Sequence, residues 1–125
     1  MNLPADLKYT KEHEWTKIEG NIATVGVTEF AQSELGDIAW LEMPSVGDET
    51  KIGETFGTIE AVKTVEDLYA PLSGKISEIN SELLDSPELV NDDPYGKGWI
   101  VKLELSDETE IAKLLSADDY AGLIE

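Results

Sequence analysis

Cysteine and arginine are both absent from the 125-residue sequence. Without cysteine there is no disulfide, no thiolate nucleophile and no cysteine-based zinc site. The single histidine, His13, leaves no histidine cluster for a metal and at most one imidazole for acid–base chemistry. No apolar run approaches the ~20 residues needed to span a bilayer, and the first residues resemble neither a signal peptide nor a transit peptide. We therefore expect no metal site, and a soluble intracellular protein that is either bacterial or a processed organellar form.

Positive charge is scarce in this sequence. Nine lysines stand against 27 Asp and Glu residues, which gives a formal net charge of −18 at pH 7. An acidic surface of this size repels phosphate backbones and anionic lipid headgroups, so we expect neither nucleic acid nor a membrane as a partner. It favours partners with basic docking faces, whose association depends on salt. High solubility or a salt-adapted source would account for the same charge.

Recognisable catalytic motifs are missing as well. One histidine without partners at a known spacing does not indicate a catalytic triad. The sequence contains no glycine-rich phosphate loop and no EF-hand. Adjacent acids such as Asp92 and Asp93 are typical of a solvated surface. An enzyme would therefore need its reactive group from elsewhere.

The residues that are present predict one mainly β domain spanning residues 1–125. Hydrophobic residues make up 41% of the chain, enough for a core. Apolar alternation predicts strands over residues 14–18, 22–27, 38–43, 54–61, 64–70, 75–79 and 99–105. In the last of these, Trp99, Val101, Leu103 and Leu105 alternate with Ile100, Lys102 and Glu104. We expect a small antiparallel sandwich or barrel.

Helix signals are confined to short segments and to the end of the chain. Thr28 is predicted to cap a helix over residues 29–35, which Gly36 ends. Residues 81–94 indicate short helical turns. From Asp107 the pattern is helical in two pieces, with approximate capping boxes at Asp107 with Glu110 and at Ser116 with Asp119. A C-terminal helical segment is therefore expected to pack on the β domain.

Lys63 occupies a distinctive position between two of the predicted strands. Only Val62 and Lys63 separate the runs 54–61 and 64–70, so the spacing predicts a hairpin with Lys63 at its tip. The tip directs its side chains into water. Taken alone, an exposed lysine in a turn is ordinary.

Five segments give this lysine a context: LKYTKEHEW (7–15), VGVTEFAQSELGDI (25–38), LEMPSVGDE (41–49), FGTIEAVKTVEDLYAPLSGKI (56–76) and LVNDDPYGKGWIVKL (89–103). In this order and spacing, the sequence resembles the H protein family of the glycine cleavage system over nearly its whole length. The segment Glu60-Ala61-Val62-Lys63 is also similar to the wider class of lipoyl and biotinyl carriers. A biotin carrier would place methionine beside the lysine, where Val62 and Thr64 stand. The resemblance implies a barrel-sandwich hybrid of the lipoyl/biotinyl carrier type.

The resemblance further implies that Lys63 carries lipoic acid as N6-lipoyllysine. Such a carrier is not itself an enzyme, because the cofactor supplies the chemistry and the protein supplies position and shielding. It shuttles an aminomethyl group from glycine decarboxylase (P protein) to a tetrahydrofolate-dependent aminomethyltransferase (T protein). Dihydrolipoyl dehydrogenase (L protein) reoxidises the arm, and a lipoate-attaching enzyme installs it. A monomer in the bacterial cytoplasm is implied, or in the mitochondrial matrix for a processed eukaryotic form.

Four further residues match functional positions of the family. Glu60 and Gly47 match positions that the attaching enzyme reads, and Glu14 and Asp67 match acidic positions lining the cleft where the loaded arm lies. Their ordinary interpretations are an exposed strand carboxylate, a turn glycine and two surface carboxylates. His13 is expected to be a packed or hydrogen-bonded residue of the first strand rather than a catalyst.

The sequence departs from the family pattern near the arm. Ala61 stands where the family usually has serine, and Thr64, Val65 and Glu66 replace an alanine-rich stretch that contains serine. Phe30 and Glu34 also differ from residues that many or some members carry. These differences concern the details of arm docking.

Three other functions remain open on sequence grounds. A relay that donates lipoyl groups to other 2-oxoacid dehydrogenase complexes needs the same hairpin and lysine. An unmodified scaffold or binding module, and an enzyme in its own right, fit the residues less well. The intact mass of the native protein separates lipoyl from biotin and from no modification.

Overall fold

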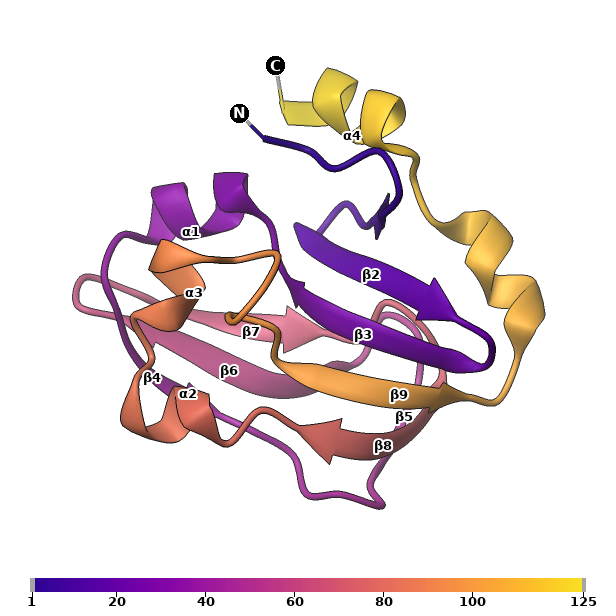
Figure 1. The fold of residues 1–125 in the computed structure, drawn as a ribbon, viewed down its shortest axis with the longest axis horizontal. Coiled ribbons are helices and arrows are strands. Elements are labelled where there is room, and N and C mark those ends of the chain that lie inside the picture. The colour runs from indigo at the N-terminus through magenta and orange to yellow at the C-terminus, as the bar shows by residue number, and fades with distance from the viewer. Residues whose placement is uncertain (1, 125) are drawn as a thin grey trace.

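Nine strands form two antiparallel sheets in the computed structural model, which describes residues 2–124 (Figure 1). The six-stranded sheet has the order β1-β2-β3-β9-β8-β5, with bounds Lys8–Tyr9, Glu14–Glu19, Ile22–Val27, Val101–Leu105, Gly74–Ile79 and Glu49–Thr50. The three-stranded sheet has the order β4-β6-β7, with bounds Ile38–Glu42, Thr55–Ala61 and Val65–Tyr69. The predicted mainly β, antiparallel fold is thereby confirmed.

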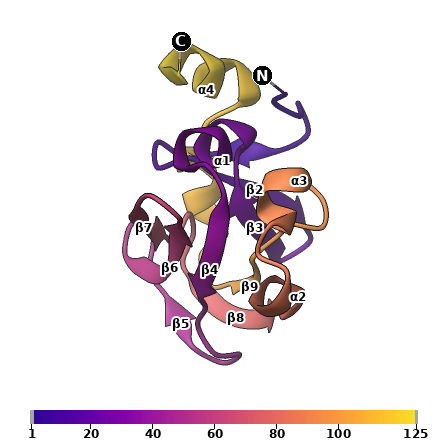
Figure 2. The same ribbon diagram turned by 90° about the vertical axis from the view of Figure 1, so that its left-hand side faces the viewer.

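Short helices occupy the connections and the C-terminal end. Helix α1 (Glu29–Leu35) joins β3 to β4, and α2 (Glu82–Asp85) and α3 (Leu89–Asp92) lie between β8 and β9. A 3₁₀ helix, Glu108–Lys113, and α4 (Ala117–Ile124) follow β9. Figure 2 shows α1 between α4 and the β4-β6-β7 sheet, with the N-terminal segment beside α4. The site described below lies on this side of the molecule.

The main core lies between the two sheets. Alternate residues of facing strands are apolar and point inward, as the period of two requires. Buried members include Val25, Leu41, Ile59, Leu68, Ile76 and Leu103. Removal of this apolar surface from water is the main force that holds the sheets together.

A second core joins the two ends of the chain. The rings of Tyr9 and Tyr120 stack with centroids 4.9 Å apart, and Leu7 and Trp15 pack in the same cluster. Gly26 faces Trp15 across β2 and β3, and a Cβ atom there would lie 2.6 Å from the indole Nε1. Only glycine therefore leaves room for the indole at this position of β3. This cluster fixes α4 against the start of the chain.

Most predicted elements are observed within two residues of their expected ends. The Thr28 hydroxyl accepts a hydrogen bond from the Ala31 amide and begins α1, and Gly36 ends it with a φ of 81°. Strands β1 and β5 are missing from the predicted pattern, because a strand of two residues is too short to show alternation of apolar and polar side chains.

Two details of the predicted pattern were wrong. The alternation predicted for residues 99–105 groups Ile100 with Lys102 and Glu104, yet Ile100 is fully buried. It precedes the first residue of β9, Val101, and so does not follow the alternation of that strand. Glu110 was placed in a capping box, but its carboxylate accepts hydrogen bonds from the amide and hydroxyl of Ser73. The chain there forms a 3₁₀ helix, and because the Glu110 carboxylate bonds to Ser73, it does not cap that helix.

Candidate functional site

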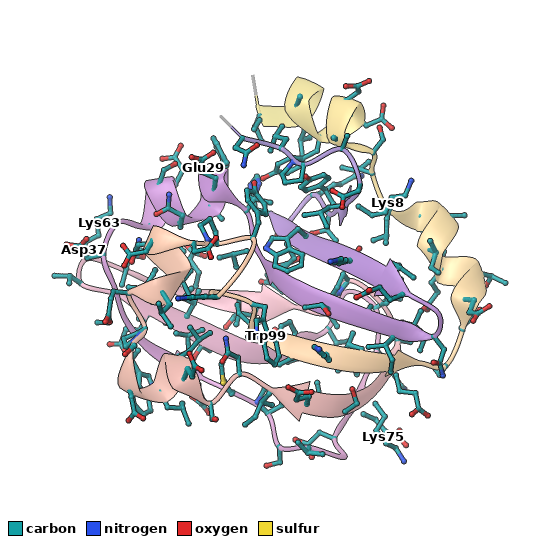
Figure 3. The ribbon with its side chains drawn as sticks, viewed as in Figure 1. Lys8, Glu29, Asp37, Lys63, Lys75 and Trp99 are labelled. Atoms are coloured by element: carbon teal, nitrogen blue, oxygen red, sulfur yellow. The ribbon has the colours of Figure 1, made fainter. Side chains whose placement is uncertain are left out.

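Lys63 lies at the tip of the β6–β7 hairpin, as predicted, and its side chain is exposed. The turn is closed by a hydrogen bond of 2.8 Å from the Ala61 amide to the Thr64 carbonyl. A second bond, 3.0 Å long, runs from the Val62 amide to the Asp37 carbonyl in the α1–β4 connection. Figure 3 shows Lys63 and Asp37 together at this edge of the molecule. The hairpin tip is therefore held at two points while the amine stays accessible.

The Lys63 side chain folds back over the end of α1. A Cβ atom on Gly36 would lie 3.5 Å from Cε of Lys63 and 3.9 Å from its Nζ. Gly36 has a left-handed φ of 81°, which favours glycine. The helix end therefore favours glycine here, and the lysine side chain lies within van der Waals distance of this position.

Asn91 of α3 fixes the segment that supports the tip. Its Nδ2 donates to the Gly36 carbonyl at 2.8 Å, and its Oδ1 accepts from the Ile38 amide at 2.9 Å. These bonds clamp the chain on both sides of Asp37, whose carbonyl holds Val62. Sequence reasoning missed this role, although Asn91 lies in the LVNDDPYGKGWIVKL segment.

A pocket of about 360 Å³ lies beside α1, between the start of β2 and β7. Its α1 wall includes Glu34 and Leu35, which directly precede the Gly36 that the lysine covers. The lining combines apolar side chains, such as Phe30 and Leu35, with five carboxyl groups: Glu12, Glu14, Glu34, Glu66 and Asp67. The structure therefore brings Glu14 and Asp67 to one pocket, next to the lysine-bearing hairpin. Glu12, Glu34 and Glu66 also line it and were not proposed as site residues.

Glu14 is a buried carboxyl group of this pocket, with 2% of its surface exposed. The Thr10 hydroxyl donates to its Oε1 at 2.7 Å, and the Tyr69 amide donates to its Oε2 at 3.4 Å. Burial nevertheless raises the pKa of Glu14 from 4.5 to about 8. At neutral pH Glu14 is therefore protonated in most molecules. A cation placed next to it would favour its ionisation.

His13 lines the same pocket and lies in the turn just before β2, with a φ of 70°. Its Nδ1 is 2.8 Å from the Tyr120 hydroxyl, and its ring lies 5.0 Å from that of Phe30. The expected packed, hydrogen-bonded histidine is confirmed, although it precedes the strand. Burial lowers the pKa of His13 below its usual 6.5, so the ring is neutral at pH 7.

The hydrogen bonds around Tyr120 fix the tautomer of His13. The buried Thr28 hydroxyl accepts from the Ala31 amide, and the Tyr120 hydroxyl, 2.8 Å away, is the one acceptor for its hydrogen among the described residues. Thr28 therefore donates to Tyr120, and Tyr120 donates to Nδ1 of His13. His13 then carries its proton on Nε2. Through this series of hydrogen bonds, α4 is connected to the cap of α1 and to the pocket.

The two residues expected to be read by an attaching enzyme lie apart. Glu60 is exposed on β6, three residues before Lys63. Gly47 lies in the connection between β4 and β5, has a φ of 97° and donates its amide to the Ile76 carbonyl on β8. Figure 1 shows that connection at the lower edge of the molecule and the β6–β7 tip at its left edge. The fold thus brings Glu60, but not Gly47, next to the lysine.

Residues 2–124 contain no group of three or more His, Cys, Asp or Glu side chains that could hold a metal ion. No helix among these residues is long and apolar enough to cross a membrane.

Known proteins match the chain over nearly its whole length. The family profile described as "Glycine cleavage H-protein" matches residues 7–125. A glycine cleavage system H protein from Carboxydothermus hydrogenoformans is 56% identical over 123 residues, covering 98% of this chain and 95% of the relative. One from Staphylococcus epidermidis is 59% identical over 124 residues, with 99% and 98% covered. The crystal structure of a glycine cleavage system H protein from Mycobacterium marinum superposes with a TM-score of 0.86 at 39% identity, covering 95% of this chain and 96% of that one.

Proposed function

The chain belongs to the glycine cleavage H-protein family, and on this premise we propose that Lys63 bears a lipoyl group in amide linkage to its Nζ. Family membership makes the chain a lipoyl carrier of the glycine cleavage system, which works with the other components of that system. The observation that supports Lys63 is its position: it is exposed at a hairpin tip that two hydrogen bonds hold, its side chain lies over Gly36 at the end of α1, and an acidic pocket lies beside the same helix.

The residues around Lys63 fit a lipoyl group. The pocket volume lies within the range of small-molecule sites, its apolar wall suits a hydrocarbon chain, and its carboxyl groups suit an amine. When bound, a lipoyl group supplies a disulfide that takes up the aminomethyl group and is later regenerated by oxidation. The chain itself binds and orients the lipoyl arm and shields the aminomethyl group from water.

The pocket residues have distinct parts in this proposal. Glu14 and Asp67 hold the cationic amine by charge-assisted hydrogen bonds. Because a positive charge favours ionisation of Glu14, we expect that carboxyl group to release its proton when the amine docks. The apolar side chains of Phe30 and Leu35 limit the access of water to the carbon next to the amine.

The proposal extends to partners and place of action. The partners are glycine decarboxylase (P protein), the aminomethyltransferase (T protein), dihydrolipoyl dehydrogenase (L protein) and a lipoate-attaching enzyme that reads Glu60 and Gly47. The chain is a non-catalytic carrier whose residues 1–125 form one domain, monomeric and cytoplasmic, in keeping with its bacterial relatives. A lipoyl relay is not favoured, because these relatives are named for the glycine cleavage system.

The decisive variant is Lys63→Arg. Arginine keeps the positive charge, but its guanidinium stays protonated and is not a usable nucleophile. We expect a native circular dichroism spectrum together with complete loss of the mass increment of one lipoyl group. Lys75→Arg, at another exposed lysine, is the matched control and should be lipoylated normally. Lipoylation that persists in Lys63→Arg on a different lysine would refute the assignment.

A further inference from the structure

Apolar side chains gather on the outer surface beside Lys63. Residues 2–124 expose six large hydrophobic side chains, and three of them lie here: Trp40 (49% exposed), Val62 (81%) and Val65 (57%). The other three are spread over the β4–β5 connection, α2 and α4. Single exposed apolar side chains are common, but a group of them next to a functional residue indicates an interaction site.

The strand register places two of these side chains on either side of Glu60. Trp40 pairs with Glu60 across β4 and β6, and Glu60 pairs with Val65 across β6 and β7. Residues paired in this way share one face of a sheet. Their neighbours Leu41 and Ile59 are buried on the opposite face. Trp40 and Val65 therefore flank Glu60 on the outer face, roughly 10 Å apart at the usual spacing of strands.

The charge of this face is negative. Glu42 and Thr58 form the next row across β4 and β6 and share the face of Glu60. Strands β4, β6 and β7 with the β6–β7 turn contain one basic residue, which is Lys63 itself. A partner that covers the face must therefore combine an apolar recess with a basic rim.

We propose that Trp40, Val62 and Val65 form the docking surface for the lipoate-attaching enzyme, with Trp40 as the principal anchor. This inference rests on the function proposed above. An unmodified lysine holds its amine on a stem of only four methylene groups, so an enzyme that acylates it must contact the hairpin and its flanking strands. Enzymes that act on a long arm can work at a greater distance from these strands. Tryptophan is also the residue type most enriched among the energetic centres of interfaces.

Steady-state lipoylation of the purified unmodified chain, with purified lipoate–protein ligase, lipoate and ATP, tests the inference. We expect Trp40→Ala to raise the KM for the chain by about tenfold or more, with kcat little changed. Trp40→Phe should recover most of the loss, and Val65→Thr, which keeps shape and β-propensity, should raise the KM less. Leu123→Ala is the matched control, because Leu123 is 48% exposed on α4, and it should behave as the wild type.

The outcomes separate this inference from the proposed function. Wild-type KM values for Trp40→Ala and Val65→Thr, with lipoyl located at Lys63 by peptide mass, would overturn the docking surface alone. Absence of lipoyl from Lys63 in the wild-type chain would overturn both. An effect of Trp40→Ala confined to reoxidation by dihydrolipoyl dehydrogenase, or a wild-type dimer that Trp40→Ala dissociates, would assign the face to another occupant and contradict the inference.

Discussion

At Glu14, burial and hydrogen bonding act on the pKa in opposite directions. The Thr10 hydroxyl and the Tyr69 amide stabilise the carboxylate, but removal from water destabilises it more, and the pKa rises to about 8. A site that only packed side chains would place an apolar residue here. A buried carboxyl group that a cation can ionise is a better match for a pocket that receives an amine.

The first prediction concerns the stability of Glu14→Gln. Because the pKa in the folded chain (about 8) lies above the unfolded value (4.5), the unfolded chain loses this proton first as pH rises. Wild-type stability should therefore fall as the pH rises between these two values, by at most about 5 kcal/mol from this group alone. Glu14→Gln lacks this loss, so its stability relative to wild type should increase from pH 4.5 to 8 and then level off.

Urea denaturation of both proteins at several pH values measures this difference. Other titrating groups are shared by the two proteins and cancel in the comparison. A pH-independent difference for Glu14→Gln would show that Glu14 ionises as easily in the folded chain as in the unfolded one.

A second prediction combines Glu14→Gln with Asp67→Asn. Lipoylation and reoxidation of the arm should be nearly normal, because neither step uses the docked amine. Without tetrahydrofolate, formaldehyde and ammonia should be released about five- to thirtyfold faster, equivalent to the loss of about 1–2 kcal/mol from charged hydrogen bonds. Colorimetric detection of formaldehyde gives the rate. Release at the wild-type rate would exclude these two residues from docking while leaving Lys63 unaffected.

At the scale of elements, α1 and the β6–β7 hairpin could be predicted because their signals are local. The cap of α1 joins Thr28 and Ala31, three positions apart, and the hairpin turn likewise joins Ala61 and Thr64. Such contacts follow from residue type and spacing within one stretch of chain. The resemblance to a family then gave this hairpin a function that alternation alone does not indicate.

Contacts between distant segments could not be predicted in this way. Asn91 reaches Gly36 and Ile38 across more than 50 residues, and it places the carbonyl that holds the hairpin tip. From the sequence, Glu14 is an ordinary carboxylate of a strand. Only the fold shows that β7 and the turn at Thr10 enclose it. Residue type and alternation carry no information on which remote segments meet. The position of Lys63 at a hairpin tip could therefore be predicted, but the burial of Glu14 and the hydrogen bonds that support the tip could not.

At the scale of the whole molecule, Tyr120 connects the C-terminal helix to the rest of the chain. It stacks on Tyr9 near the start of the chain, and its hydroxyl joins the α1 cap at Thr28 to His13 of the pocket. The ends of the sequence thus support α1, whose C-terminal Gly36 lies next to the Lys63 side chain. This arrangement gives α4 a role in shaping the pocket from outside the two sheets.

The last prediction is that Tyr120→Phe changes the titration of His13 as well as stability. Loss of the hydroxyl leaves the buried Thr28 hydrogen without its acceptor and Nδ1 of His13 without its donor, which should cost about 1–3 kcal/mol. The hydrogen bond to Nδ1 favours the neutral ring, so its loss should raise the pKa of His13 toward 6.5. His13 is the one histidine in the sequence, and its NMR titration is therefore unambiguous.

Tyr95→Phe is the control for this prediction. Tyr95 also bonds near the start of α1, accepting from the Glu29 amide at 3.0 Å and donating to the Asn2 carbonyl at 2.7 Å, but it does not contact His13 by hydrogen bonding. It should therefore lower stability while the His13 titration stays that of the wild type, because the Tyr120 hydroxyl remains in place. If Tyr120→Phe and wild type titrate alike, the hydroxyl does not hold His13, and α4 contributes to the fold without acting on the pocket.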